Sequence, residues 1–488
     1  MNRIPARIFA VLICAVSICC FASCKSSSNI TAVSPAPDSE PYVPRTEQNR
    51  KIDMIMWYDC DGWVSSMELG DNRAERPQQA CRVSDTYMGK YSSLSEKTAL
   101  QHAYWIYSLG CNAICCDWTN YISYRQRGSD FSYNKRIYSN TEKMLKTLKN
   151  IEAFSAPALY VAIRLSDFKY EELQMKLDDV YALYENYKDE WYYFDDGTEN
   201  ALKPFVVIFT DVFYTGSKWY DRLHNTWHEG EELSFYEDSR FNIRWSNGYL
   251  GVTAQEDEKG RLRIGENQPY WTFVEPYTDK KAGKGYYEVM YNVGKNGEVE
   301  QMSCWASMYA DNSYWDPLNN IIDGKTTFER TIRCVSELMP KALLINRFNY
   351  PLAWPEEPQE GLSLFESTHI EPNYDFGFSV FDNVKQNLYE LNGWEKSAPP
   401  APACTISDGS GKILAALKSG SAKVFLSLEG EPQMYRMSVS PDMTDAGYVY
   451  YDLTEGIILP EELKDFDGTV YLQTQNAFGD SSVVSIGQ

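Results

Sequence analysis

The chain has 488 residues, 43% of them hydrophobic and 14% aromatic, so it is long enough to bury a large core and to form more than one domain. Its formal net charge is −22, from 68 acidic and 46 basic residues. Such an acidic chain is disfavoured as a partner of nucleic acids or of anionic lipid surfaces. The composition therefore predicts a folded, enzyme-sized protein with no nucleic-acid partner.

The first residues have the pattern of an export signal. A basic start with Arg3 and Arg7 precedes an apolar run that is shorter than the ~20 residues of a membrane-spanning helix. The run ends in Phe21-Ala22-Ser23-Cys24, which resembles the lipobox of bacterial lipoproteins, although leucine is usual at the position of Phe21. The alternative is an ordinary signal peptide with a chance cysteine.

We expect the segment 1–23 to be a lipoprotein signal peptide and the Ser-, Pro- and Thr-rich segment 24–50 to be a flexible tether. The mature protein would then be anchored by a lipid on Cys24 in the bacterial cell envelope, facing either the periplasm or the outside. The signal carries two positive charges and no acid, so its removal changes the net charge from −22 to −24.

Eight short apolar runs follow, separated by longer amphipathic segments. The runs are Ile52–Tyr58, Ala113–Trp118, Ala158–Arg164, Phe205–Phe213, Phe241–Tyr249, Tyr270–Pro276, Met302–Ser307 and Ala342–Phe348. Helical spacing of apolar residues marks Leu94–Leu109, Thr141–Phe154, Tyr170–Tyr187 and Phe328–Leu338. Alternating strands and helices indicate a parallel sheet buried on both faces, and eight repeats predict an α/β fold, a (β/α)8 TIM barrel over residues 51–396.

The composition and the hydrophobic pattern of the sequence change after the predicted barrel. A Pro- and Ala-rich hinge precedes short apolar runs that are separated by turn residues. We expect residues 398–488 to form a small accessory β-sandwich, which either helps to bind the ligand or braces the barrel.

Polar and aromatic residues stand at the carboxyl ends of the predicted strands, where TIM barrels carry their active sites. The candidate catalytic acids are Asp117, Asp211, Glu275 and Glu371. The candidate substrate-binding residues are Tyr58, Asp59, Trp118, Asn120, Trp271, Trp305, Asn346 and Asn349. For each acid the plainer alternative is a helix cap or an ion pair, and for each tryptophan it is a place in the core.

No metal or cofactor is expected. The four histidines form no HExxH or similar cluster, and the cysteines form no CxxC pair at zinc-site spacing.

Four stretches carry a resemblance to a known group of glycan-active barrels. They are "GCNAICCDWTNY", "YYFDDGTENALKPFVVIF", "TTFERTIRCVSELMPKALLINRFN" and "FESTHIEPNYDFGFSVFDNVKQNL". Together they resemble glycoside hydrolase families 71 and 99 over residues of about 50 to 395. The resemblance implies a (β/α)8 barrel that acts on a carbohydrate, in which Glu371 matches an Ile-Glu-Pro motif.

One position departs from the group. Where its members read Trp-Asn-Glu after strand eight, this chain has Tyr350 after Phe348-Asn349. The run Trp227-His228-Glu229 follows strand four. It resembles part of the catalytic motif of family 99 in residue types but not in position. We therefore expect a lipid-anchored glycoside hydrolase acting on an oligo- or polysaccharide, with a catalytically silent, surface glycan-binding lipoprotein as the alternative.

Glycosidic cleavage needs two carboxyl groups, roughly 5 to 5.5 Å apart for retention or about 6.5 to 9.5 Å for inversion. Strands one, two and eight are neighbours in a closed barrel, so Asp117 and Glu371 are expected to approach each other across the end of strand one. If they do not, Asp211 or Glu275 is expected to take the role.

Overall fold

The computed structural model describes most of the predicted barrel and C-terminal region. The described residues are 30–32, 50–60, 86–89, 91, 94–119, 121, 123, 132–165, 170–210, 212–215, 218–221, 226–229, 237–247, 254–259, 261–264, 270–273, 290–294, 297–306, 325–346, 348–349, 370–374, 376–407, 423–459, 463, 466 and 468–486. The chain divides into a larger unit of residues 42–398 with 476–478, and a smaller unit of residues 1–41, 399–475 and 479–488.

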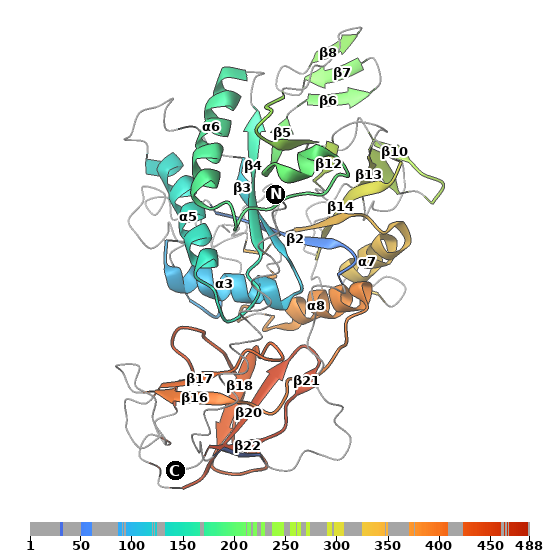
Figure 1. The fold of residues 1–488 in the computed structure, drawn as a ribbon. Helices are drawn as coiled ribbons and strands as arrows, with labels where there is room; N and C mark the ends of the chain where they lie inside the picture. Colours follow the sequence, from blue (N-terminus) through green and yellow to red (C-terminus); the bar gives the residue numbers. More distant parts are fainter. Residues whose placement is uncertain are drawn as a thin grey trace, which may run out of the picture. The chain divides into compact units, whose positions relative to one another are not determined.

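The larger unit is a nearly closed barrel of eight parallel strands (Figure 1). In chain order they are β2 (Asp53–Tyr58), β3 (Ala113–Trp118), β4 (Ala158–Leu165), β5 (Phe205–Thr210), β9 (Asn242–Asn247), β12 (Tyr270–Thr272), β14 (Val299–Trp305) and β15 (Ala342–Asn346). Their order in the sheet is β14-β15-β2-β3-β4-β5-β9-β12, and every neighbouring pair is parallel. All eight overlap predicted runs, which confirms the TIM-like barrel.

The ring lacks a backbone ladder between β12 and β14. The edge of β14 is taken by β13 (Met290–Val293), which pairs with it antiparallel and continues through β11 (Leu262–Ile264) to β10 (Ala254–Glu256). The side chain of Gln301 bridges the gap, because its Oε1 accepts from the N–H of Thr272 at 2.7 Å and its Nε2 donates to the Thr272 carbonyl at 3.1 Å. Side-chain hydrogen bonds therefore replace the missing ladder, and those of the Gln301 carboxamide reach the backbone of Thr272.

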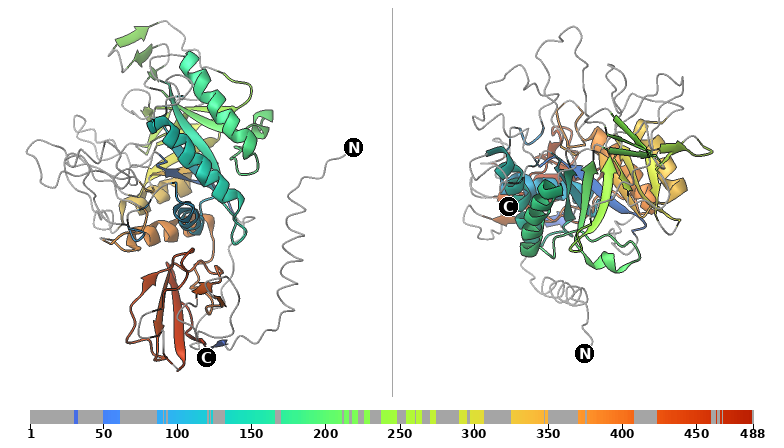
Figure 2. Two further views of the ribbon diagram at one scale, coloured as in Figure 1. Left: turned by 90° about the vertical axis from the view of Figure 1, so that its left-hand side faces the viewer. Right: turned by 90° about the horizontal axis from the view of Figure 1, so that it is seen from above.

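Helices cover the outside of the barrel. They are α3 (Glu96–Ser108), α5 (Ser132–Lys149), α6 (Tyr170–Asn186), α7 (Thr327–Leu338) and α8 (Ser379–Asn392), and η3 (Glu199–Leu202) is a short 3₁₀ helix. Both views of Figure 2 place α5 and α6 on one side of the strands and α7 and α8 on the other. The predicted bounds of the third and fourth helices are close to those of α6 and α7. The prediction of Thr141–Phe154 was wrong at both ends, since α5 begins nine residues earlier and ends at Lys149.

A separate antiparallel sheet interrupts the barrel after β5. It contains β6 (Val212–Thr215), β7 (Lys218–Asp221) and β8 (Thr226–Glu229). The predicted fourth strand therefore ends at Thr210, and Trp227-His228-Glu229 lies on β8, outside the barrel sheet. Within the described ranges, no helix combines the length and the apolar character that crossing a membrane requires.

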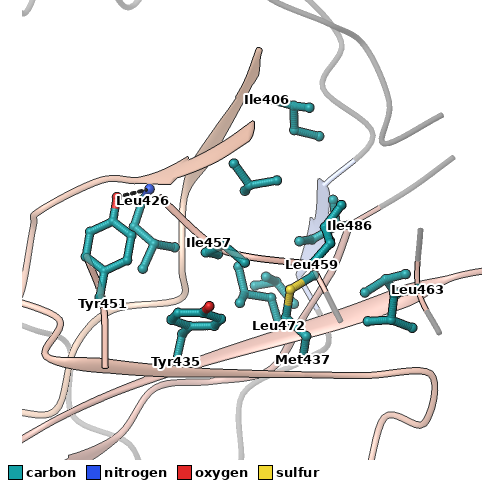
Figure 3. Close-up of a cluster of buried hydrophobic side chains, with 13 residues drawn as sticks. Ile406, Leu426, Tyr435, Met437, Tyr451, Ile457, Leu459, Leu463, Leu472 and Ile486 are labelled. Atoms are coloured by element: carbon teal, nitrogen blue, oxygen red, sulfur yellow. Dashed lines mark hydrogen bonds between the residues drawn. The ribbon is translucent and has the colours of Figure 1, made fainter. Parts of the chain in front are cut away.

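The smaller unit contains two antiparallel sheets. One has the order β1 (Ile30–Ala32), β22 (Val484–Ile486), β20 (Val470–Asn476), β18 (Met434–Ser438) and β19 (Val449–Tyr450), with β21 (Gly479–Asp480) beside β20. The other pairs β16 (Cys404–Ser407) with β17 (Lys423–Leu426). Both sheets contribute to one hydrophobic cluster (Figure 3), where the Tyr451 hydroxyl accepts a hydrogen bond from the N–H of Leu426. The description as a β-sandwich stays a prediction, and β1 falls in the segment predicted to be a tether.

Candidate functional site

Three aromatic rings meet inside the barrel. The ring of Trp57 on β2 lies 5.7 Å from that of Phe209 on β5 and 4.6 Å from that of Phe273, which follows β12. The rings of Phe209 and Phe273 are 5.0 Å apart. These strands are not neighbours in the sheet, so their side chains touch across the interior. We call the three rings the aromatic wall; Trp57 and Phe273 are buried, whereas Phe209 is half-buried.

Asp117 lies on the inner face of the barrel, the face that carries this wall. Trp57 is the register partner of Cys115 on β3, and Asp117, two residues further, shares the strand face of Cys115. The Asp117 carboxylate accepts hydrogen bonds from the backbone N–H of Thr119 at 2.8 Å and from its hydroxyl at 2.6 Å. Asp117 is half-buried. A fixed carboxylate therefore stands at the carboxyl end of a central strand.

Glu371 is held in a different environment. Its Oε1 lies 3.1 Å from Nε2 of His102 on α3, and its Oε2 accepts from the hydroxyl of Tyr91 at 3.1 Å. The other ring nitrogen of His102 lies 2.9 Å from the hydroxyl of Tyr58. Glu371 is 1% exposed and His102 0%. We call Tyr58, Tyr91, His102 and Glu371 the Glu371 cluster.

Burial determines the protonation of the two tyrosines in the Glu371 cluster. It raises the pKa of Tyr58 well above the usual range, and the nearby Cys116 and Glu371 raise it further. Burial, followed by the Glu371 charge, does the same to the pKa of Tyr91. Both phenols thus remain donors at neutral pH: Tyr91 donates to Glu371, and Tyr58 can donate to Nδ1 of His102, which leaves the Nε2–H to donate to the carboxylate.

The position of Tyr58 shows where this cluster lies. Its side chain contacts His102 on a covering helix, whereas the preceding residue, Trp57, faces the interior. The Glu371 cluster therefore lies between the barrel wall and α3, with both Glu371 oxygens already bonded. Glu371 bonds to His102 and Tyr91, whereas the Asp117 carboxylate bonds to Thr119.

The side chain of Asn349 binds the backbone just after β2. Its Oδ1 accepts from the N–H of Asp59 at 2.9 Å and its Nδ2 donates to the Asp59 carbonyl at 3.0 Å. The N–H of Glu371 donates to the Phe348 carbonyl at 3.0 Å, and the N–H of Phe348 donates to the Trp57 carbonyl at 2.9 Å. Hydrogen bonds thus link the carboxyl end of β2, the residues after β15 and the segment that contains Glu371.

Two of the predicted sugar-binding tryptophans are core residues in this arrangement. The indole N–H of Trp118 donates to the Thr141 hydroxyl on α5 at 2.7 Å, and the side chain is fully buried. Trp271 packs against Phe205 at 4.5 Å and donates to Glu300 at 2.7 Å. For both residues the structure favours the core alternative.

Several predicted site residues lie outside the described part of the chain. They are Asn120, Asp211, Glu275 and the side chain of Trp305, together with the variant position Tyr350. Of the described His, Cys, Asp and Glu side chains, no three form a group that could hold a metal ion.

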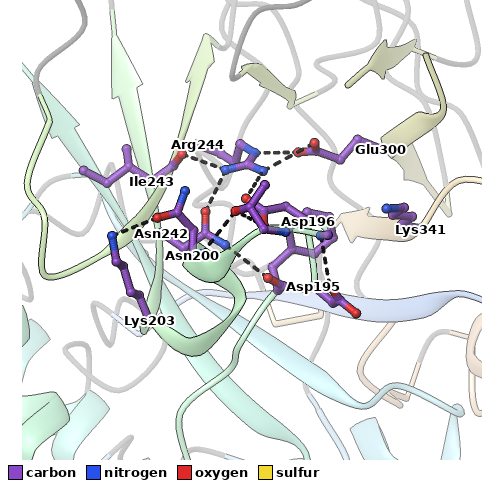
Figure 4. A network of polar contacts seen from close by, with 12 residues as sticks. Asp195, Asp196, Asn200, Lys203, Asn242, Ile243, Arg244, Glu300 and Lys341 are labelled. Atoms are coloured by element: carbon purple, nitrogen blue, oxygen red, sulfur yellow. Dashed lines mark hydrogen bonds and ion pairs between the residues drawn. The ribbon is translucent and has the colours of Figure 1, made fainter. Parts of the chain in front are cut away.

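A polar network at the amino-terminal ends of the strands was not predicted (Figure 4). Arg244 on β9 bonds Glu300 at 2.5 Å, Asp196 at 3.2 Å and Asn242 at 2.7 Å. Burial alone would raise the pKa of Asp196, but hydrogen bonds from Thr198 and Arg244 outweigh it and lower the pKa. Asp196 belongs to the "DDGTENALKP" stretch, so this part of the resemblance has a structural use at the end opposite Asp117.

His102 and Tyr91 were also missed. His102 occupies the buried face of an apolar helix, and Tyr91 lies 280 residues from its partner in the chain. No local pattern marks either residue.

Comparison with known proteins gives weak matches. No protein-family model and no curated protein matches the chain. Two solved structures of a GH99 endo-alpha-mannosidase from Bacteroides thetaiotaomicron, one of them in complex with BIS-TRIS-Propane, are 12% and 11% identical, with a TM-score of 0.38 for each, and the matches cover 70% of this chain and 98% of that one. A "glycoside hydrolase-like protein" is 10% identical with a TM-score of 0.36, covering 72% of this chain and 96% of its own. These scores are low, so the assignment of the barrel rests on the order and direction of its strands.

Proposed function

We propose that the chain is a lipid-anchored glycoside hydrolase that acts on an oligo- or polysaccharide at the carboxyl end of the barrel. The observation that carries this proposal is that the half-buried Asp117 carboxylate and the aromatic wall share the inner face of the barrel. A carboxylate next to aromatic surface suits a sugar, because the ring stacks on the aromatic face while the acid works on the glycosidic oxygen. The sequence resemblance to glycan-active barrels points the same way.

In this mechanism Asp117 is one of the two carboxyls. The second is Asp211 or Glu275, whose predicted positions follow strands four and six. Glu371 has a positioning role, because both its oxygens accept hydrogen bonds within the Glu371 cluster and it is 1% exposed. By holding Tyr58, α3 and the segment after strand eight together, it keeps the end of strand one in place beneath the ligand.

The test uses protein that lacks residues 1–24 and a panel of mannans, α-glucans and host-type N-glycans, with released reducing ends as the readout. Asp117→Asn should lose ~10²-fold or more in turnover, as removal of an acid-base group typically does. It should stay folded, because an asparagine oxygen can still accept from Thr119. Glu371→Gln is the comparison, and it should lower the thermal midpoint, since an amide N–H₂ would face the donor of His102 or Tyr91.

A non-catalytic glycan-binding protein is the second candidate. It is favoured by Tyr350 at the position of the motif glutamate and by the fully bonded carboxyl of Glu371. Binding of a panel member without release of reducing ends would decide for this candidate.

A further inference from the structure

Three buried polar side chains inside the barrel have no hydrogen-bond partner among the atoms of the structure. The atoms concerned are Nε1 of Trp57, Oγ of Ser246, and both Oδ1 and Nδ2 of Asn346. The exposed fractions of these residues are 2%, 1% and 1%. Buried polar groups are nearly always satisfied, and each group left without a partner costs stability. Such a cost is expected where a fold keeps hydrogen-bonding capacity for a ligand.

The three residues border the aromatic wall. Asn346 on β15 and Trp57 on β2 each follow the register pair Ile345 and Met56, so they are neighbours on adjacent strands. Ser246 on β9 is the register partner of Phe209. Phe209 contacts the Trp57 ring and is the half-buried member of the wall. Three strands thus place unsatisfied polar atoms beside the aromatic wall. The wall is partly exposed to solvent at Phe209.

We propose that Trp57, Ser246 and Asn346 form a subsite that receives one neutral sugar ring at the floor of the barrel mouth. The inference rests on the proposed function and adds the class of ring that is bound. The indole N–H can only donate, the hydroxyl donates or accepts, and the carboxamide does both, which matches sugar hydroxyls that donate and accept. None of the three groups carries a charge, so a neutral ring fits better than an acidic one.

The experiment compares binding with stability in three conservative variants. Ser246→Ala and Asn346→Leu remove polar atoms and nearly keep the outline of the side chain, whereas Trp57→Phe removes the indole N–H together with part of the ring system. Every protein also carries Asp117→Asn, so that the neutral oligosaccharides of the panel are not cleaved during calorimetric titration. Ser108→Ala is the matched control, because Ser108 is equally buried but donates to the Trp105 carbonyl at 3.0 Å.

We expect affinity to fall about three- to ten-fold for Ser246→Ala and Trp57→Phe, and about ten-fold or more for Asn346→Leu, which loses donor and acceptor together. The thermal midpoints of the free Ser246→Ala and Asn346→Leu variants should stay level or rise, because an unsatisfied group is removed, whereas that of Trp57→Phe should fall because a buried ring is truncated. Ser108→Ala should show the reverse: a lower midpoint and unchanged affinity.

Two outcomes would overturn the subsite. If the variants lose stability and bind the panel as before, the three groups serve an internal water. If they keep both stability and affinity, the groups have no ligand. Failure of the parent protein to bind any panel member is a different result, which contradicts the proposed function itself.

Discussion

Lys176 shows how burial of a single residue makes stability depend on pH. It lies on α6, is 4% exposed, and donates from Nζ to the Arg164 carbonyl at 2.7 Å. Burial lowers its pKa to about 8. The unfolded chain keeps this proton to about pH 10.4. Between these values the unfolded chain binds more protons, so stability rises with pH in this window.

We therefore expect the free energy of unfolding to rise by about 2 to 3 kcal/mol from pH 7 to pH 10 in the native protein relative to Lys176→Met. Urea denaturation of both proteins over this range measures the difference. The comparison cancels the titration of buried thiols and phenols, which the two proteins share. Parallel pH profiles would show that Lys176 is not the cause.

The sequence predicted residues at the candidate site where a strand ends or where a motif resembles that of a known group. Asp117 was found because an apolar run stops at an acid, and the plainer alternative for Trp118 was stated because an indole serves equally as core. Glu371 was found by motif, but its partners were not, because the hydrogen bonds to His102 and Tyr91 span 269 and 280 residues. Contacts at such separations leave no local signal.

Among the elements, α7 begins with a clear local start signal. The Thr326 hydroxyl accepts from the N–H of Glu329 at 3.2 Å, and Glu329 accepts from the N–H of Thr326 at 2.5 Å, which completes a capping box. Thr326→Ala should cost about 1 kcal/mol of unfolding free energy. Ser336→Ala is the control, since this exposed hydroxyl on the same helix only donates to the Arg333 carbonyl. Equal midpoints in urea for the two variants would contradict the role of the cap.

Helix α5 shows why some boundaries could not be predicted. Its buried positions Asn140 and Thr141 are polar, so they break the apolar period. They are buried because Asn140 donates to the Cys60 carbonyl and Thr141 accepts from Trp118. Strands were easier to predict, because a parallel sheet buried on both faces needs continuous apolar runs.

For the whole molecule, the predicted lipid anchor remains a proposal. The chain is strongly acidic, so charge gives no attraction to an anionic membrane, and attachment would depend on the acyl chains at Cys24. Cys24→Ser should move the protein from the membrane to the soluble fraction, or block removal of the signal. Fractionation followed by mass determination of the mature N-terminus measures this. Unchanged membrane partitioning of Cys24→Ser would contradict the anchor.

The bridge made by Gln301 has a mechanical consequence. Separating two laddered strands means breaking a row of backbone bonds. Separating β12 from β14 means breaking side-chain bonds: those of Gln301 to Thr272, one between the hydroxyls of Thr272 and Ser303, and one from the Trp271 indole to Glu300. The Gln301 carboxamide can break its hydrogen bonds to Thr272 by rotating about its side-chain single bonds. Both strands then keep the ladders to their other neighbours. Within the described barrel, the seam between β12 and β14 is thus where two strands can separate without losing a backbone ladder.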